Sequence, residues 1–197
     1  MSKLFGHGAA VLAVALSLCA SPFVATSVVA QASVVGYGDT AAVTFTRPAD
    51  TTAYASGDIV CQSTTVSASG CAPLTFAVSR QADKSFLIPR ARISASNTTL
   101  TNASFRLHLY RQSPTIANGD NGAWSTTNSN YMGSMDVTFD RQFTDGAKGI
   151  AVPSSGSYIV GVPDSGTTAI YGLLEARAAY APTNAQTFTI LLEILQN

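Results

Sequence analysis

The chain carries little charge. Its 197 residues include 11 lysines and arginines and 11 aspartates and glutamates, so charged residues make up only 11% of the sequence and the net charge is zero. A typical globular protein has about 25% charged residues. A nucleic-acid-binding protein needs a basic excess, which is missing. A disordered chain is poor in apolar residues, whereas 46% of this chain is apolar. A neutral composition of this kind is typical of secreted, cell-surface and assembly proteins.

Groups that perform catalysis are also scarce. The only histidines are His7 and His108, and no nucleophile elbow, phosphate-binding loop, dinucleotide fingerprint or zinc-protease motif is present. His108 alternates outward on a predicted strand between Arg106 and Tyr110, which favours an ordinary surface position. The sequence therefore predicts a non-enzymatic protein with no catalytic residues, cofactor or metal site.

The aspartates do not form a recognisable site either. Asp136 and Asp140 are four residues apart on a predicted strand, which separates them by roughly 13 Å, and we expect both to be solvated. This distance exceeds that of a carboxylate pair in an inverting glycosidase. Asp120 lies in an Asp-Asn-Gly sequence, which favours a turn over a calcium site because spaced carboxylates are lacking.

Residues 1–38 form a hydrophobic N-terminal segment, which precedes a predicted domain over residues 39–197. No charged side chain occurs between Gly8 and Gly38, and residues 9–30 are almost wholly apolar. Lys3 before this run and the small residues at its end are typical of a secretory signal peptide cleaved after Ala32. The run is also long enough to span a membrane, although Pro22 interrupts it. A third interpretation is an assembly arm that is buried against a partner subunit.

Two of the three cysteines flank a polar turn. Cys61 and Cys71 would close a disulfide across this turn in an oxidising compartment. The alternative is a pair of half-buried thiols in neighbouring strands. Neither these two nor Cys19 has the spacing of a zinc site.

Strand patterns dominate residues 39–197. Pro89 predicts that its strand is an edge strand or carries a bulge. Residues 113–130 predict a long loop with Trp124 buried inside it, and a pair of strands before it is expected to be joined through Ser69 and Gly70. We predict an all-β protein, an antiparallel β-sandwich of jelly-roll type with a hydrophobic N-terminal arm, and a closed barrel is the alternative. The predicted strands cover residues 41–47, 58–66, 73–79, 84–96, 104–111, 131–143, 156–163, 169–180 and 187–195.

The charges are unevenly distributed along this domain. Residues 80–111 contain six basic side chains and one acidic one, whereas residues 113–145 contain four aspartates and one arginine. One interpretation is pairing between neighbouring strands of the same molecule. The other is a basic surface that binds a partner. The candidate partner contacts are then Arg80, Lys84, Arg90, Arg92, Arg106 and Arg111, together with Trp124.

Four segments occur in an order that resembles a known family. They are RPADTTAYASGDIV (residues 47–60), FRLHLYRQSPTIANGDNGAW (105–124), YMGSMDV (131–137) and IYGLLEARAAYAPTNAQTFTILLEI (170–194). In this order they resemble virion structural proteins of tailed bacteriophages, which are commonly found among head genes and regarded as capsid-decorating proteins. The resemblance covers about three quarters of the chain. It contains no catalytic residues to carry over.

The resemblance implies a capsid decoration protein on the virion surface that stabilises the shell by bridging capsid subunits. The implied partners are the major capsid protein and further copies of the chain, as a homotrimer, without nucleic acid. Family members mostly begin near the RPADTTAY-like strand, so the segment over residues 1–38 departs from the pattern, and the arm interpretation fits a virion best.

Two alternatives place the domain elsewhere. An exported or cell-surface binding module would carry a Cys61–Cys71 disulfide and use Trp124 to stack on a glycan. A tail or head-fibre component would contact the host. Membrane contact is expected only if residues 1–38 are an export signal.

Overall fold

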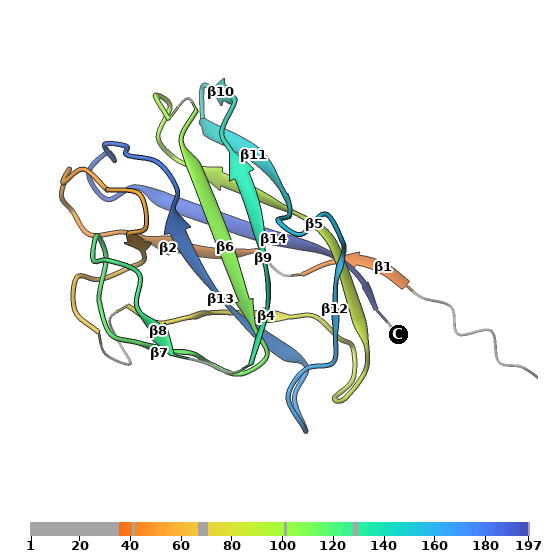
Figure 1. Ribbon diagram of the computed structural model, residues 1–197. Coiled ribbons are helices and arrows are strands. Elements are labelled where there is room, and N and C mark those ends of the chain that lie inside the picture. Colours follow the sequence, from red (N-terminus) through yellow and green to blue (C-terminus); the bar gives the residue numbers. More distant parts are fainter. Residues whose placement is uncertain (1–35, 41, 67–70, 101, 128–129, 197) are drawn as a thin grey trace, which may run out of the picture. The chain divides into compact units, whose positions relative to one another are not determined.

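In the computed structural model, residues 36–40, 42–66, 71–100, 102–127 and 130–196 are described, and they contain strands, turns and no helix (Figure 1). The predicted N-terminal segment lies outside the described residues except for residues 36–38. The strands are β1 Gly36–Asp39, β2 Val43–Thr46, β3 Ile59–Val60, β4 Leu74–Ala77, β5 Phe86–Ala95, β6 Ser104–Tyr110, β7 Thr115–Ile116, β8 Thr126–Thr127, β9 Tyr131–Thr138, β10 Arg141–Phe143, β11 Gly146–Pro153, β12 Ile159–Gly161, β13 Ala169–Ala176 and β14 Thr187–Gln196.

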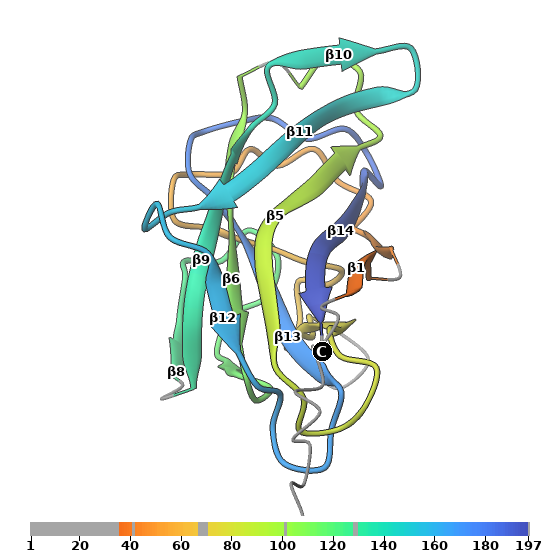
Figure 2. The same cartoon turned by 90° about the vertical axis from the view of Figure 1, so that its right-hand side faces the viewer.

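Eight of these strands form two antiparallel sheets. The first sheet has the order β2-β14-β5-β11, and the second has the order β4-β13-β6-β9. With the strands numbered along the chain, this order is that of a jelly roll, in which two Greek keys are folded over each other. The predicted all-β antiparallel sandwich is therefore confirmed. Because β11 pairs with both β5 and β9, the two sheets are joined along one side into a curled sheet (Figure 2).

The core lies between the two sheets and follows from their alternating sequences. On β6 the residues Phe105, Leu107 and Leu109 are fully buried, as the sequence predicts. Phe105 from the second sheet contacts Phe188 from the first, with ring centroids 5.3 Å apart. Phe188 in turn stacks on Phe45 of β2. Apolar burial of this extent is the dominant stabilising contribution of the fold.

Strand β11 was not predicted because its glycines and proline are typical of turns. Its inward residues are small, since Val137 and Phe139 already fill the interior beneath it. A Cβ atom at Gly149 would lie 2.6 Å from a methyl carbon of Val137. The bulky apolar residues of β11, Ile150 and Val152, consequently point outward and are about half exposed.

The predicted pairing of the two strands around the cysteines is wrong. β3 and β4 do not pair with each other, because both pair with β13 at different positions. β3 lies opposite Leu174 and Glu175, and β4 lies opposite residues 169–172.

One of the two alternatives predicted for the strand that contains Pro89 is confirmed. β5 is an interior strand, with β14 on one side and β11 and β12 on the other, so it is not an edge strand. The register with β14 shifts between Glu193 and Leu195, next to Pro89, which confirms the predicted bulge. Pro89 lies where the neighbour of β5 changes from β11 to β12, so its missing N–H is accommodated.

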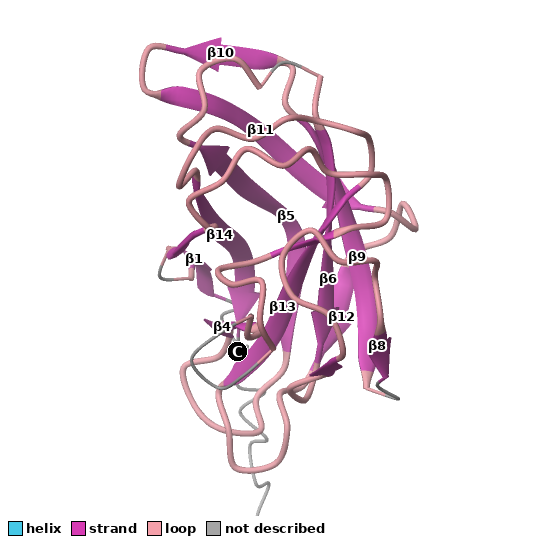
Figure 3. Cartoon of the chain, turned by 90° about the vertical axis from the view of Figure 1, so that its left-hand side faces the viewer, coloured by secondary structure: helices cyan, strands magenta, loops and turns pink. Residues whose placement is uncertain are grey.

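The long loop over residues 113–130 covers the outer face of the second sheet. β7 and β8 pair within this loop, and loops cross in front of β6 and β13 in Figure 3. A second apolar cluster forms beneath it, with Trp124 and Tyr171 packed against its edge. Trp124 is partly buried, as expected for a side chain held inside the loop. The buried members of the cluster are Ile59, Cys61, Cys71, Tyr110, Ile116 and Leu173.

Candidate functional site

A groove of about 450 Å³ lies on the outer face of the first sheet. We call it the β11 groove, because β11 and the hairpin that joins it to β10 form one wall. Its apolar side chains include Phe143, Ile150 and Leu191, and cations border them. The lining residues are Ala42, Arg92, Ile93, Ser94, Asp140, Arg141, Phe143, Lys148, Gly149, Ile150, Thr189 and Leu191.

The register of the strands places these side chains in rows across the sheet. Ile150 lies opposite Arg92, and Arg92 lies opposite Leu191. Directly opposed residues project from the same face of a sheet, so an apolar, cationic and apolar side chain stand side by side. Phe143 is 46% exposed and the Lys148 ammonium lies 4.9 Å from its ring centroid. The groove therefore presents apolar surface bordered by Arg92, Arg141 and Lys148 and by the carboxylate of Asp140. Lys148 is itself paired with Asp145, whose carboxylate lies 2.9 Å from its ammonium.

A buried carboxylate holds Arg92 of the groove and the neighbouring Arg90. The Arg92 Nε atom lies 3.1 Å from Glu193 Oε1 in an ion pair, and Arg90 donates to the other oxygen of the same carboxylate. The Glu193 side chain is only 4% exposed, whereas about half of each arginine side chain remains accessible. Glu193 thus fixes both arginines on the outer face.

Further exposed apolar side chains lie on β11 and on or beside β12. We call Val152, Tyr158, Val160 and Val162 the apolar ridge. Their exposed fractions are 53%, 63%, 64% and 41%, so all four are accessible. A groove of about 420 Å³ separates Val160 and Val162 from Tyr131 on β9.

The outer face of the second sheet carries a different kind of cluster, centred on His108. The His108 Nε2 atom lies 2.7 Å from Glu175 Oε2, and Arg177 donates to the other oxygen of Glu175. The indole of Trp124 lies over the imidazole, with ring centroids 4.2 Å apart. Next to this group Arg106 binds Asp136 through two parallel hydrogen bonds. We call these six residues the His108 cluster.

The charged groups of the His108 cluster are paired with one another, although the side chains of Asp136 and Arg177 stay 43% and 41% exposed. Burial lowers the pKa of His108, and the hydrogen bond to Glu175 opposes that effect. The hydrogen bond from Arg106 lowers the pKa of Asp136. The expectation that His108 is an ordinary surface residue is therefore wrong. Asp136 is paired with Arg106 but keeps 43% of its side chain exposed, so it is partly solvated. Asp140 is exposed but lies beyond the end of β9, so the two aspartates do not share a strand.

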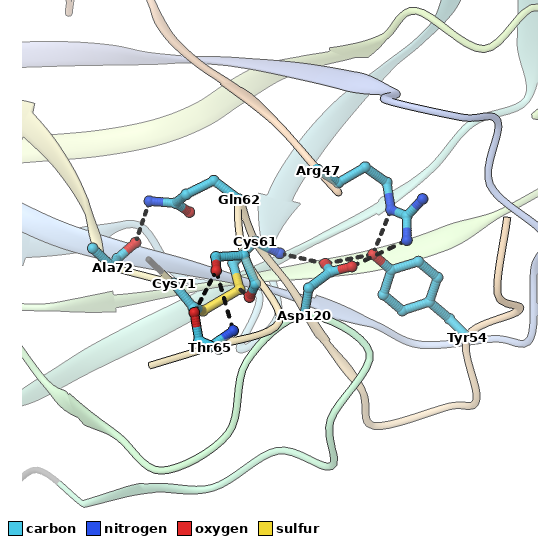
Figure 4. Close-up of a disulfide and its surroundings, with 9 residues drawn as sticks. Arg47, Tyr54, Cys61, Gln62, Thr65, Cys71, Ala72 and Asp120 are labelled. Atoms are coloured by element: carbon cyan, nitrogen blue, oxygen red, sulfur yellow. Dashed lines mark hydrogen bonds and ion pairs between the residues drawn. A yellow bond between two sulfur atoms is a disulfide. The ribbon is translucent and has the colours of Figure 1, made fainter. Parts of the chain in front are cut away.

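Behind the long loop a buried ion pair anchors Asp120 (Figure 4). The Arg47 guanidinium lies 3.0 Å from Asp120 Oδ2, and both side chains are fully buried. The Tyr54 hydroxyl and the backbone N–H of Cys61 both donate to Asp120 Oδ1. Burial raises the pKa of Asp120, and these donors oppose it. Asp120 is thus more than a turn residue, because it ties the long loop to two distant segments.

Cys61 and Cys71 are joined by a disulfide, with their Cα atoms 5.4 Å apart. Both cysteines are buried in the second apolar cluster. Since Cys61 also donates to Asp120, the disulfide and the ion pair hold the same part of the loop region.

The predicted partner contacts do not form one patch. Arg90 and Arg92 lie together on the outer face of the first sheet, whereas Arg106 lies on the outer face of the second. Arg111 follows β6 beside Asn130, and Lys84 is exposed just before β5. The other two are Arg80, which lies beside the backbone of Gly36, and Trp124, which packs on His108.

The Arg106–Asp136 pair joins the basic and acidic regions of the sequence, as the intramolecular interpretation expects. A partner role for the other cations stays a prediction.

Sequence reasoning missed three side chains of the β11 groove, Phe143, Ile150 and Leu191. The alternation of small and bulky residues over 146–153 is the signal that was available for Ile150.

Within the described ranges, the side chains of His, Cys, Asp and Glu form no group of three or more that is suited to a metal ion. That part of the chain also holds no helix with the length and apolarity to cross a membrane.

Comparisons of the chain with models of protein families, with curated proteins and with solved structures find no match.

Proposed function

We propose that the protein is a non-enzymatic structural component of a bacteriophage virion that decorates and stabilises the capsid by bridging its subunits. The β11 groove is the observation that carries this proposal. It combines accessible apolar side chains with the anchored cation Arg92 on the outer face of a sheet, which is the composition of a protein-binding surface.

Two further features support a structural role. Jelly-roll sandwiches are used in viral capsid proteins, although a fold by itself does not establish function. The most elaborate polar group, the His108 cluster, directs its histidine to a buried carboxylate and covers one face of the ring with Trp124. Such an arrangement holds a loop in place and offers no activated nucleophile.

The proposed mechanism is stabilisation by mass action. A decoration protein that binds only the assembled shell adds its binding free energy to the assembled state. The capsid partner would insert apolar side chains between Phe143, Ile150 and Leu191, and its carboxylates would meet Arg92 and Arg141. No catalytic step, cofactor or nucleic acid takes part.

Co-sedimentation with capsids that lack the protein tests this proposal. We expect Ile150→Asp to reduce occupancy at least about tenfold, because it places a carboxylate in the apolar centre of the groove. Val66→Asp is the matched control, since Val66 is also an exposed β-branched apolar side chain but follows Thr65, whose carbonyl accepts a hydrogen bond from Cys71 of the disulfide. Raising the salt concentration should weaken binding of the unmodified protein. Equal binding of both variants would contradict the proposal, and insensitivity to salt would remove its electrostatic part.

The Cys61–Cys71 disulfide favours a second candidate, an exported or cell-surface binding module. Intact mass spectrometry without reductant separates the two. A mass near the full 20.4 kDa from a particle fraction supports the virion component. A mature chain that starts at Ser33, recovered from the medium, supports export.

A further inference from the structure

Backbone hydrogen bonds hold the long loop to the segment over residues 57–63, which contains β3. A Cβ atom at Gly119 of the loop would lie 2.2 Å from the carbonyl oxygen of Thr64, so the two backbones are also in direct contact there. The position of the loop therefore depends on the position of this segment. The hydrogen bonds are Trp124 N–H to the Gly57 carbonyl at 2.7 Å, Ile59 N–H to the Gly122 carbonyl at 2.9 Å, Asn121 N–H to the Ile59 carbonyl at 2.9 Å and Asp120 N–H to the Ser63 carbonyl at 2.7 Å.

The Cys61–Cys71 disulfide holds the same segment to the chain that enters β4. Cys61 directly follows β3, and Cys71 lies shortly before β4. Since β3 and β4 pair with different parts of β13, the disulfide cross-links two strands that do not pair with each other. Cleaving it would leave this connection to noncovalent contacts, such as the hydrogen bond from the Gln62 side chain to the carbonyl of Ala72 at 3.3 Å (Figure 4). The disulfide therefore determines how firmly the hydrogen-bonding partner of the loop is held.

The loop in turn packs on the cluster that contains the two cysteines. Each cysteine is only 2% exposed, and both belong to the second apolar cluster. Ile116, from β7 within the loop, is a buried member of the same cluster, and Trp124 packs against its edge. Cleavage of a disulfide requires a thiolate to contact one of its sulfur atoms. A loop packed on this cluster therefore hinders a reductant from reaching the disulfide.

We propose that the Cys61–Cys71 disulfide and the long loop form a redox latch, in which the disulfide locks the loop over the second sheet and the locked loop shields the disulfide. Reduction releases the loop and withdraws Trp124 from the imidazole of His108, so the His108 cluster becomes accessible. The latch goes beyond capsid binding and does not depend on it. If the proposed virion function holds, the latch closes after the particle leaves the cytoplasm, where thiols are kept reduced.

The oxidant that closes the latch is a small-molecule disulfide such as oxidised glutathione. The thiolate of one cysteine attacks a sulfur atom of this oxidant and displaces one small thiolate. The thiolate of the other cysteine then attacks the mixed disulfide, forms the Cys61–Cys71 bond and displaces the second small thiolate. The two cysteines lose two electrons, which the oxidant gains, and their two protons pass to the released thiolates.

Acrylamide quenching of Trp124 fluorescence tests the lock, because Trp124 is the single tryptophan of the chain. The full chain carries Cys19→Ser in these measurements, so that only two thiols can react. We expect reduction with dithiothreitol to raise the quenching constant at least about twofold, because the loop opens locally. Ile159→Ala with an intact disulfide is the control, since it removes a buried side chain of the main core and should leave the constant unchanged. An unchanged constant on reduction, or loss of strand content throughout the reduced protein in circular dichroism, would overturn the latch.

The rate at which dithiothreitol cleaves the disulfide tests the shield, with alkylation and mass spectrometry as the readout. Ile116→Ala weakens the packing of the loop, whereas Ile159→Ala removes a similarly buried isoleucine from the main core. We expect cleavage at least about fivefold faster than in the unmodified chain for Ile116→Ala, and a change of less than about twofold for Ile159→Ala. Equal rates in the two variants would overturn the latch. Neither experiment contains capsids, so failure of the latch leaves the proposed function intact, and a lack of capsid binding leaves the latch intact.

Discussion

The two outer faces of the sandwich differ in how far their central charged groups are covered: the side chains of His108 and Glu175 are 13% and 7% exposed, whereas those of Arg90 and Arg92 are about half exposed. On the second sheet, the long loop covers His108 and Glu175, and each charged group of the cluster has a partner inside the same molecule. On the first sheet, Arg90 and Arg92 are anchored by Glu193 but keep about half of their side-chain surface accessible, and apolar side chains stand between them and Lys148.

Because of this difference, we expect the two faces to affect different properties: the covered face affects stability, and the open face affects association with a partner. Buried charges require partners, because an unpaired charge in the interior is costly. The covered face therefore contributes to the fold, and changes there should lower stability. The open face is not needed to complete the core, so changes there should alter association while the fold persists.

Removing the buried carboxylate of Asp120 should have the largest effect. Asp120→Asn leaves the fully buried Arg47 without this carboxylate, so we expect the free energy of unfolding to fall by about 3–5 kcal/mol in urea titrations. Asp50 also contacts Arg47 but its side chain is 37% exposed. Asp50→Asn is therefore the control and should cost less than about 1 kcal/mol. Equal losses of unfolding free energy in the two variants would mean that burial does not determine how strongly an ion pair with Arg47 stabilises the protein.

Loss of the disulfide should come next. Replacing both cysteines by serine frees a loop whose ends are 10 residues apart, and we expect a loss of about 2–3 kcal/mol. Because this loop region also contacts Asp120, the fluorescence of the single tryptophan, Trp124, should change on reduction. Identical unfolding curves with and without reductant would contradict a stabilising role.

Acidification should lower the free energy of unfolding by a smaller amount, through the protonation of His108. Burial lowers its pKa below the usual value of 6.5, so the unfolded chain binds the proton more readily than the folded protein. Stability should therefore fall as the pH drops from 7 through about 6.5 and below, and level off once folded His108 is also protonated. Urea titrations between pH 7 and pH 5 measure this slope. His108→Gln should flatten it, and an unchanged slope in that variant would assign the effect to another group.

The smallest effect on stability is expected on the open face. Ile150→Asp should change the free energy of unfolding by less than about 0.5 kcal/mol, because Ile150 is 51% exposed. The same variant should lose capsid binding. A large loss of stability in thermal unfolding would show that the two faces do not differ in the proposed way.

Much of the sandwich follows from local patterns. Period-two alternation on β6 identifies its buried Phe105 and Leu107, and Pro89 correctly marks a bulge. These features depend on residues close in sequence. The order of the strands in the sheets depends on long-range pairing, and for this reason the expected pairing around the cysteines fails when both strands pair with β13 instead.

The candidate site was harder to predict for the same reason. Ile150 faces outward because Val137 on β9 and Phe139 just after β9 occupy the space beneath Gly149. The salt bridge of Arg92 depends on Glu193, which is about 100 residues later in the chain and meets it only in the folded sheet. His108 looked like a surface residue because nothing local shows that Trp124 covers it.

Photo-crosslinking in assembled particles tests the central claim most directly. A photoreactive amino acid is placed at position 150 in the β11 groove or at position 138, an exposed threonine on the second sheet. If the open face binds the shell, position 150 should crosslink to the major capsid protein and position 138 should not. Crosslinks to the capsid protein from position 138 alone would contradict the account.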